Sequence, residues 1–159
     1  MKIRFLCLTV LAFFGLASTA SAGYVAASWQ TNSVAFLDDN FVQYGGFGLT
    51  TGASGPNGIA TDGSTIWVGD FSTASVTRYD FSGNVLGEFF DPGFTALQGM
   101  ELVGSELAVA SITGPDTINF YDSITGTYIR SITDPLVGHI EGLAYDGSNL
   151  FVRGTPIAV

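Results

Sequence analysis

A repeat of about 42 residues is the feature that most limits what this chain can fold into. Three segments open with a glycine, and these glycines, Gly58, Gly99 and Gly142, lie 41 and 43 residues apart. Each glycine precedes a short apolar run, a turn and a second apolar run. A later apolar run in each unit ends in an aspartate, and these aspartates recur every 42 residues at Asp38, Asp80 and Asp122. Strand units at a period of about 40–45 residues are typical of β-propeller blades.

Each complete unit predicts four short antiparallel strands. The Asp62-Gly63 and Asp146-Gly147 dipeptides suit hairpin turns because both residue types tolerate positive φ. Short β-branched and aromatic runs bounded by Gly, Asp, Asn and Ser favour strands over helices. The run that starts at Tyr24 matches the run that starts at Trp67, so the first unit begins partway through a blade. We therefore predict an all-β propeller with about three blades and an incomplete ring.

The predicted organisation is a leader followed by the repeat region. Residues 1–22 have a basic start, a short apolar stretch and an Ala-Ser-Ala end, as in a secretory signal peptide. An amino-terminal membrane anchor is the alternative. Residues 23–159 divide into a partial blade 23–50, blades 57–91 and 98–134, and a partial blade 140–159. We expect an exported protein that is secreted, periplasmic or on the cell surface, with no membrane span after the leader.

The predicted arc does not close, because propellers usually have about four to eight blades. Three explanations remain open at this stage. The chain is a fragment of a longer propeller, it pairs as a homodimer whose three-plus-three blades form a six-bladed ring, or it is a stable open arc. The abrupt end within a blade favours the fragment.

Charge narrows the range of partners. Two of the five basic residues, Lys2 and Arg4, lie in the leader, which leaves three arginines against 14 acidic residues and a formal charge of −11. Such a surface repels nucleic acid and anionic lipid, because phosphate binding depends on Lys and Arg. The single cysteine also lies in the leader. The remaining partners are an unidentified protein or small-molecule ligand.

One stretch resembles known propeller families. Residues 55–63, Gly-Pro-Asn-Gly-Ile-Ala-Thr-Asp-Gly, followed by Ile-Trp-Val-Gly-Asp at 66–70, are similar to NHL repeats and to the gluconolactonase (SMP-30-like) family. The resemblance implies a propeller. In the lactonase-like family, a Glu or Asn before the glycine helps to hold a divalent metal, and Asn57 and Glu141 match by position. The family's other ligands have no convincing match here.

The residues just before the leading glycines form a candidate metal site: Asn57, Gln98 and Glu141. A repeat places them equivalently around the axis, and oxygen donors of this kind suit calcium. Polar residues that satisfy backbone groups at a strand start are the alternative, and we favour it. His139 lies two residues before Glu141, so strand alternation would put both on one face. It is a candidate ligand-binding residue, with a turn histidine as the simpler reading.

Other polar and aromatic positions have structural explanations. Asp80 and Asp122 close a strand, where a carboxylate can bond to the next turn, so we favour turn formation over metal binding. Trp29 and Trp67 are better explained by blade packing than by a sugar platform. No catalytic motif is complete. The sequence therefore favours a non-enzymatic binding or scaffolding module, with a metal-dependent lactonase-like hydrolase as the alternative.

Overall fold

The computed structural model describes residues 23–49, 55–90, 96–111, 117–133 and 137–156, which fold as thirteen strands. The leader prediction for residues 1–22 lies outside the described residues. The first sheet contains β1 (Tyr24–Ser28), β2 (Ser33–Leu37) and β3 (Gln43–Gly48). The second contains β4 (Pro56–Thr61), β5 (Thr65–Asp70), β6 (Ser75–Asp80) and β7 (Val85–Phe90). The third contains β8 (Leu97–Val103), β9 (Glu106–Ser111), β10 (Thr117–Asp122) and β11 (Tyr128–Thr133), and the fourth contains β12 (Val137–Tyr145) and β13 (Leu150–Pro156).

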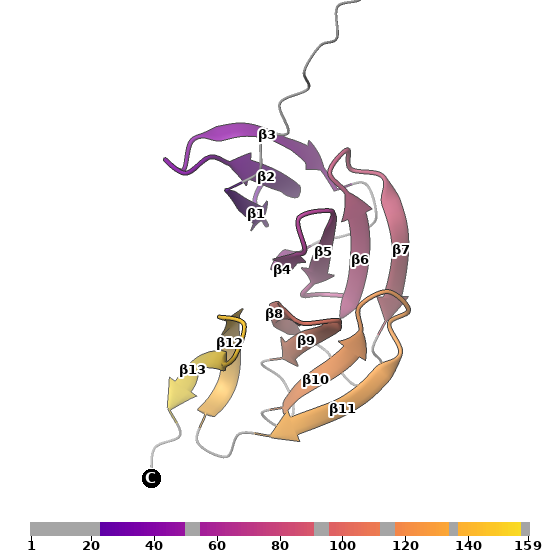
Figure 1. Ribbon diagram of the computed structural model, residues 1–159, viewed down its shortest axis with the longest axis vertical. Helices are drawn as coiled ribbons and strands as arrows, with labels where there is room; N and C mark the ends of the chain where they lie inside the picture. The colour runs from indigo at the N-terminus through magenta and orange to yellow at the C-terminus, as the bar shows by residue number, and fades with distance from the viewer. Residues whose placement is uncertain (1–22, 50–54, 91–95, 112–116, 134–136, 157–159) are drawn as a thin grey trace, which may run out of the picture.

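The four sheets are antiparallel and stand side by side as an open arc (Figure 1). Strands β4, β8 and β12 lie on the inner side of the arc, and β3, β7 and β11 lie on the outer side. This arrangement confirms the prediction of an all-β, partial propeller. None of the described residues belongs to a helix that could cross a membrane.

The register of the first sheet corrects one sequence match. Tyr24 pairs with Leu37, which directly precedes Asp38, and Ile66 pairs with Tyr79, which directly precedes Asp80. Tyr24 is therefore the equivalent of Ile66, and the match of Tyr24 to Trp67 was wrong by one residue. Because side chains alternate along a strand, a shift of one residue moves a side chain to the opposite face of the sheet.

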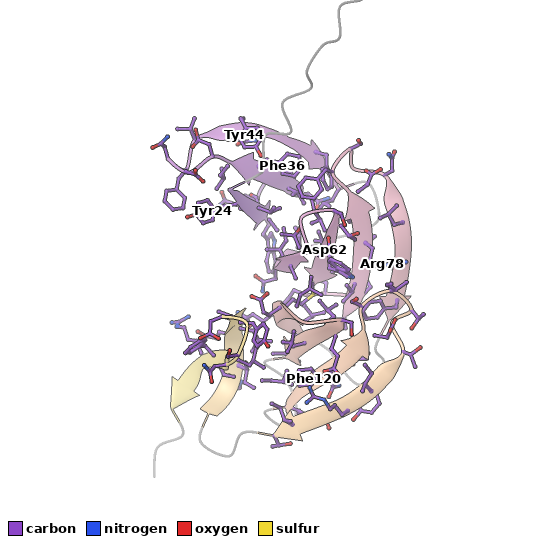
Figure 2. The ribbon with its side chains drawn as sticks, viewed as in Figure 1. Tyr24, Phe36, Tyr44, Asp62, Arg78 and Phe120 are labelled. Atoms are coloured by element: carbon purple, nitrogen blue, oxygen red, sulfur yellow. The ribbon has the colours of Figure 1, made fainter. Side chains whose placement is uncertain are left out.

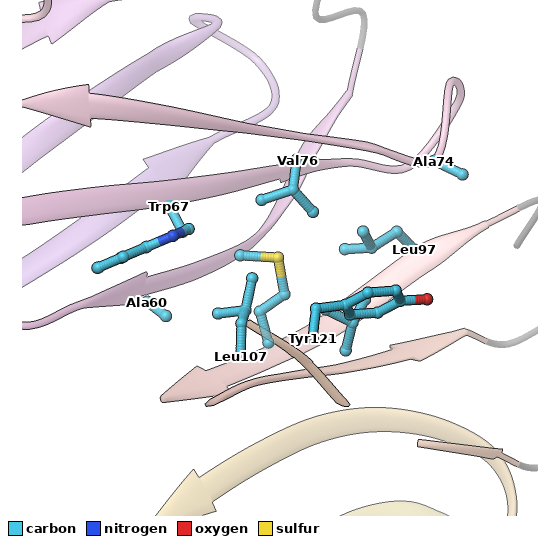
Figure 3. Packing of buried hydrophobic residues seen from close by; sticks show 9 residues of the cluster. Ala60, Trp67, Ala74, Val76, Leu97, Leu107 and Tyr121 are labelled. Carbon is cyan, nitrogen blue, oxygen red and sulfur yellow. The ribbon is translucent and has the colours of Figure 1, made fainter. Parts of the chain in front are cut away.

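The hydrophobic core is divided between successive sheets. Between the second and third sheets, Trp67 and Val76 pack against side chains of β8 and β9 (Figure 3). Separate clusters fill the spaces on either side, and Phe36 and Phe120 belong to these (Figure 2). Trp67 is 3% exposed and its Nε1–H donates to the carbonyl oxygen of Ser123 at 2.8 Å. This contact between blades confirms the packing prediction for Trp67.

The leading glycines allow neighbouring inner strands to approach closely. A Cβ at Gly58 would lie 3.0 Å from side-chain atoms of both Leu97 and Met100 on β8. A Cβ at Gly99 would lie 3.3 Å from the Leu143 side chain on β12. Because glycine has no side chain, each of these positions leaves space that an aliphatic side chain of the next inner strand fills. This packing explains why the repeat begins with glycine.

The recurring aspartates form turns, as predicted. Oδ1 of Asp80 accepts a hydrogen bond from the backbone N–H of Ser82, and Oδ1 of Asp122 accepts one from that of Thr125, both at 2.8 Å. The same contact to a following N–H recurs elsewhere, at Asp38, Asp62 and Asp146. An ionised carboxylate that accepts backbone N–H groups in this way holds the turn closed.

Candidate functional site

One rim of the arc brings aromatic and polar residues together. We call it the Trp29 rim, and it consists of the turn 29–32, the turn 71–74 and the parts of β4, β8 and β12 around Asn57, Gln98 and Glu141. Gly55 joins the two turns to β4: its carbonyl accepts from the backbone N–H of Phe71 at 2.8 Å, and a Cβ at Gly55 would lie 3.5 Å from both Trp29 and Phe71. The two turns and the start of β4 therefore pack together.

Asp70 is a buried residue whose carboxylate holds the backbone of this rim in place. It is 3% exposed, and its Oδ2 accepts from the backbone N–H of Gly55 at 3.0 Å. Its Oδ1 accepts from the backbone N–H groups of Ser72 and Thr73, both at 2.8 Å. Burial raises the pKa of Asp70, but the N–H groups of Thr73, Gly55 and Ser72 outweigh burial and hold the pKa below its usual value. The carboxylate is thus a fixed structural anion, and it fixes the backbone at the start of β4.

Three predicted site residues occupy equivalent backbone positions on this rim. Asn57 lies in a register break between Pro56 and Gly58, and Gln98 and Glu141 lie in the same kind of break on β8 and β12. A bulge inserts a residue that does not pair with the neighbouring strand, which frees its side chain from the regular pleat. The strands that carry the three residues are packed neighbours, because β8 contacts both β4 and β12.

The surroundings of these three side chains differ. Asn57 is exposed. Oε1 of Gln98 is buried and has no hydrogen-bond partner in the part of the chain that the structure describes. Oε2 of Glu141 lies 2.8 Å from Nη1 of Arg153. The arginine already balances the only carboxylate of the predicted metal site, and this ion pair weakens the attraction of the site for a cation.

His139 is also a bulge residue. It lies in the break between Gly138 and Ile140, is exposed, and has a φ of 49°. A second break follows between Ile140 and Gly142, so the regular alternation expected to put His139 and Glu141 on one face does not hold through this stretch. Within the described residues, no group of three or more His, Cys, Asp or Glu side chains could hold a metal ion. Asn57 and Gln98 would contribute neutral amide oxygens.

The structure adds an aromatic pair that sequence reasoning did not identify. Trp29 is 52% exposed, in contrast to the packing expected for it, and its ring centroid lies 5.6 Å from that of Phe71 at a tilt of 42°. The two residues hold equivalent places in the repeat, 42 residues apart. An aromatic at the same position of two successive units was the available signal, but the mismatched register of the first unit obscured it.

Glu101 is a second residue that the sequence did not single out. It lies on β8 at the position that Ala60 holds on β4, and its Oε1 accepts from the backbone N–H of Leu102 at 2.9 Å. Burial raises the pKa of Glu101, although hydrogen bonds from the backbone N–H groups of Leu102 and Tyr145 oppose the rise. The hydrogen bond to Tyr145 links the inner strands β8 and β12. Glu101 is therefore a packing residue of the inner wall.

Comparison with solved structures places the fold among propellers. BamB from Moraxella catarrhalis is similar over 82% of this chain with 16% identity and a TM-score of 0.57. Glutaminyl cyclase from Myxococcus xanthus is similar over 82% with 10% identity and a TM-score of 0.66. Sqt1 from Saccharomyces cerevisiae is similar over 78% with 13% identity and a TM-score of 0.51. The chain spans 37%, 56% and 37% of these three proteins, respectively.

These likenesses show the fold alone, because identities at this level do not carry function from one propeller to another. No family model matches the chain, and no curated protein matches it in sequence. The chain is a β-propeller-type protein, and the comparisons do not place it in the NHL or gluconolactonase family.

Proposed function

We propose that this protein is an exported, non-enzymatic propeller module that binds a protein or small-molecule ligand on the Trp29 rim. The observation that carries the proposal is the aromatic pair of Trp29 and Phe71, in which an exposed Trp29 ring lies beside a half-buried Phe71. Exposed tryptophan is enriched at binding sites because its ring supplies a large contact area and an N–H donor. The N–H of Gly55 donates to Asp70 and its carbonyl accepts from the N–H of Phe71, and these two bonds hold the backbone beside the pair in place.

Charge and composition support this kind of partner. The acidic residues outnumber the basic ones, so a neutral or basic ligand is favoured over an anionic one. Export rests on the basic start and apolar stretch of residues 1–22, which are typical of a signal peptide. The NHL-like and SMP-30-like stretch at 55–70 supports a propeller module.

A peptide-display selection against the purified protein tests the proposal. Peptides that bind the rim are expected to lose binding to Trp29→Ala and Phe71→Ala. Ile124→Ala is the matched control, because Ile124 is 67% exposed and lies in the turn between β10 and β11, away from the rim. Selected peptides that bind Trp29→Ala as well as the parent would refute the rim as the binding site.

A second candidate function is a metal-dependent, lactonase-like hydrolase with a calcium-type site at Asn57, Gln98 and Glu141. The observation that favours it is the buried Gln98 Oε1 without a described partner, since a bound cation would satisfy that oxygen. The ion pair of Glu141 with Arg153 opposes it. His139 would then be a ligand-binding residue beside the site.

Thermal unfolding with and without calcium separates the two candidates. A true site predicts that calcium raises the melting temperature, and that Gln98→Ala and Glu141→Ala abolish the rise. The control is Gln43→Ala, because Gln43 is an exposed amide on β3. If calcium leaves the parent protein unchanged, the hydrolase candidate should be abandoned.

A further inference from the structure

The outer strands β3, β7 and β11 each have a bulge at their second residue. The register with the neighbouring strand shifts there and leaves Tyr44, Leu86 and Ile129 unpaired. These three side chains are 47%, 48% and 45% exposed, respectively. A bulge changes the direction in which a side chain points from the strand. The repeat therefore presents a large apolar side chain to solvent at the same point of three successive blades.

Other exposed apolar side chains lie next to these bulges. We call the apolar residues at the first two positions of the outer strands the outer belt: Tyr44, Val85, Leu86, Tyr128 and Ile129. Phe41 and Ile124, in the turns just before β3 and β11, are each 67% exposed. These turns follow β2 and β10, whereas the turns 29–32 and 71–74 precede β2 and β6. The outer belt therefore lies at the opposite end of the strands from the Trp29 rim.

The parts of the outer belt on successive blades are neighbours, because each turn packs on the preceding outer strand. A Cβ at Gly83, in the turn before β7, would lie 2.8 Å from the Phe47 ring on β3. A Cβ at Gly126, in the turn before β11, would collide with the Phe89 ring on β7. The three outer strands follow one another around the outside of the arc (Figure 1). The outer belt is thus a row of apolar groups along that side.

Protection of a free sheet edge does not explain why the bulge residues are apolar. A bulge keeps an edge strand from pairing with another chain, but a polar residue in the bulge would serve equally well. Single exposed apolar side chains are common on protein surfaces. An apolar residue that recurs in three bulges, with further apolar residues beside it, forms a larger area of the kind that another molecule covers.

The turns beside the outer belt are acidic. Asp38 and Asp39 lie before β3, and Asp80 lies before β7. No ion pair among the described residues involves any of these three carboxylates. Hydrogen bonds from the side chain and backbone of Asn84 hold the pKa of Asp80 below its usual value, so this carboxylate is ionised at neutral pH.

The two arginines near the outer belt do not cancel this charge. Nη2 of Arg130 lies 2.6 Å from Oε2 of Glu106, so Arg130 is already paired. Arg78 helps to lower the pKa of Asp122, the aspartate that begins the turn before β11. The belt is therefore an apolar row with a negative border, most clearly beside β3 and β7.

We propose that the outer belt docks a segment of another protein in which apolar side chains are flanked by lysine or arginine. The apolar side chains would cover the bulge residues, and the cations would face the aspartates of the turns. Charge disfavours a second copy of this chain, because acidic turns would meet acidic turns, and it disfavours anionic lipid for the same reason. This proposal does not depend on the Trp29 rim.

Two peptide-display libraries that share their apolar positions and differ in charge test the proposal. One library places Lys and Arg between the apolar residues, and the other places Asp and Glu there. The parent protein should enrich peptides from the basic library only. Fluorescence anisotropy with these peptides should show that Leu86→Ser and Ile129→Ser each weaken binding by about tenfold or more, and that added salt weakens binding to the parent.

Ile132→Ser is the matched control. Ile132 lies on the same strand as Ile129 and is 42% exposed, but it pairs in regular register with Ile118. This variant should bind the basic peptides like the parent protein, and so should Trp29→Ala, which changes the opposite rim. Circular dichroism spectra and melting temperatures like those of the parent establish that the variants fold.

Several results would overturn the proposal. These are a basic library that yields no binder, equal enrichment from the acidic library, basic peptides that bind Leu86→Ser like the parent, or equal losses for Ile132→Ser and Ile129→Ser. Sedimentation velocity and flotation with phosphatidylcholine vesicles examine other occupants. If the parent self-associates or binds these vesicles, and Leu86→Ser abolishes that behaviour, a second copy or a membrane occupies the belt and the proposal is wrong.

Discussion

Replacing Trp67 by phenylalanine should strongly destabilise the protein, because this side chain joins two blades. The substitution removes the N–H that donates to the carbonyl of Ser123 at 2.8 Å, across 56 residues of sequence. Leaving that buried carbonyl without a donor costs about 1–3 kcal/mol. The smaller ring also leaves a void among Val76, Leu107 and their neighbours, which adds about 1 kcal/mol. We expect the free energy of unfolding to fall by about 3 kcal/mol.

Urea unfolding followed by far-ultraviolet circular dichroism measures this change without relying on tryptophan fluorescence. With an m-value of about 2 kcal/mol/M, the midpoint should fall by about 1.5 M. Trp29→Phe is the matched control, since Trp29 is 52% exposed, and it should change the unfolding free energy by less than about 0.5 kcal/mol. Equal midpoint shifts for the two variants would refute the assignment of Trp67 as the tie between the second and third sheets.

Three further predictions concern packing and pH. Gly69→Ala should lower the unfolding free energy by about 1–3 kcal/mol because its Cβ would collide with Leu97, whereas Gly48→Ala, with no atom within 4 Å, should change it little; urea midpoints compare them. The pKa of Asp70 is lowered by folding, so its ionised form stabilises the protein above the unfolded pKa, and this stability is lost as pH falls through the folded pKa. In a plot of melting temperature against pH, Asp70→Asn should therefore reduce the fall in melting temperature at acid pH. The pKa of Glu101 is raised by burial, so the contribution of Glu101 to stability is largest below its unfolded pKa and declines as pH rises through the folded pKa. Glu101→Gln should remove that decline in the plot of melting temperature against pH. The same decline in the variant as in the parent protein would contradict the burial argument.

Much of the fold was predictable because its signals are local. The turns after the recurring aspartates were predictable because the carboxylate bonds to backbone groups two or three residues away, as at Asp80 and Asp122. The leading glycines marked each inner strand. The register of the first sheet was not predictable, because its match to the other units rested on only a few apolar residues. An alignment error of one residue assigns every side chain to the opposite face of the sheet. That error hid the equivalence of Trp29 and Phe71.

The candidate site was predictable in position and not in environment. The sequence placed Asn57, Gln98 and Glu141 at equivalent points of the repeat, and all three lie in register breaks of inner strands. Their partners come from other parts of the fold: Arg153 reaches Glu141 from the next strand, and Oε1 of Gln98 is buried without a described donor. Pairing across strands and desolvation depend on which atoms are neighbours in space, so no spacing in the sequence specifies them.

By itself, the sequence determined that this is an all-β repeat protein with a 42-residue unit, glycine-led inner strands and an acidic surface. Periodicity and turn formation depend on residues that are close in the sequence, so they can be recognised from the sequence alone. The tertiary structure decided which faces are buried and which leading glycines pack against the next inner strand. It also decided that Trp29 is exposed while Trp67 is buried. Those outcomes depend on whether another sheet packs against a given face, because burial is a property of the assembled layers and not of the strand that carries the residue.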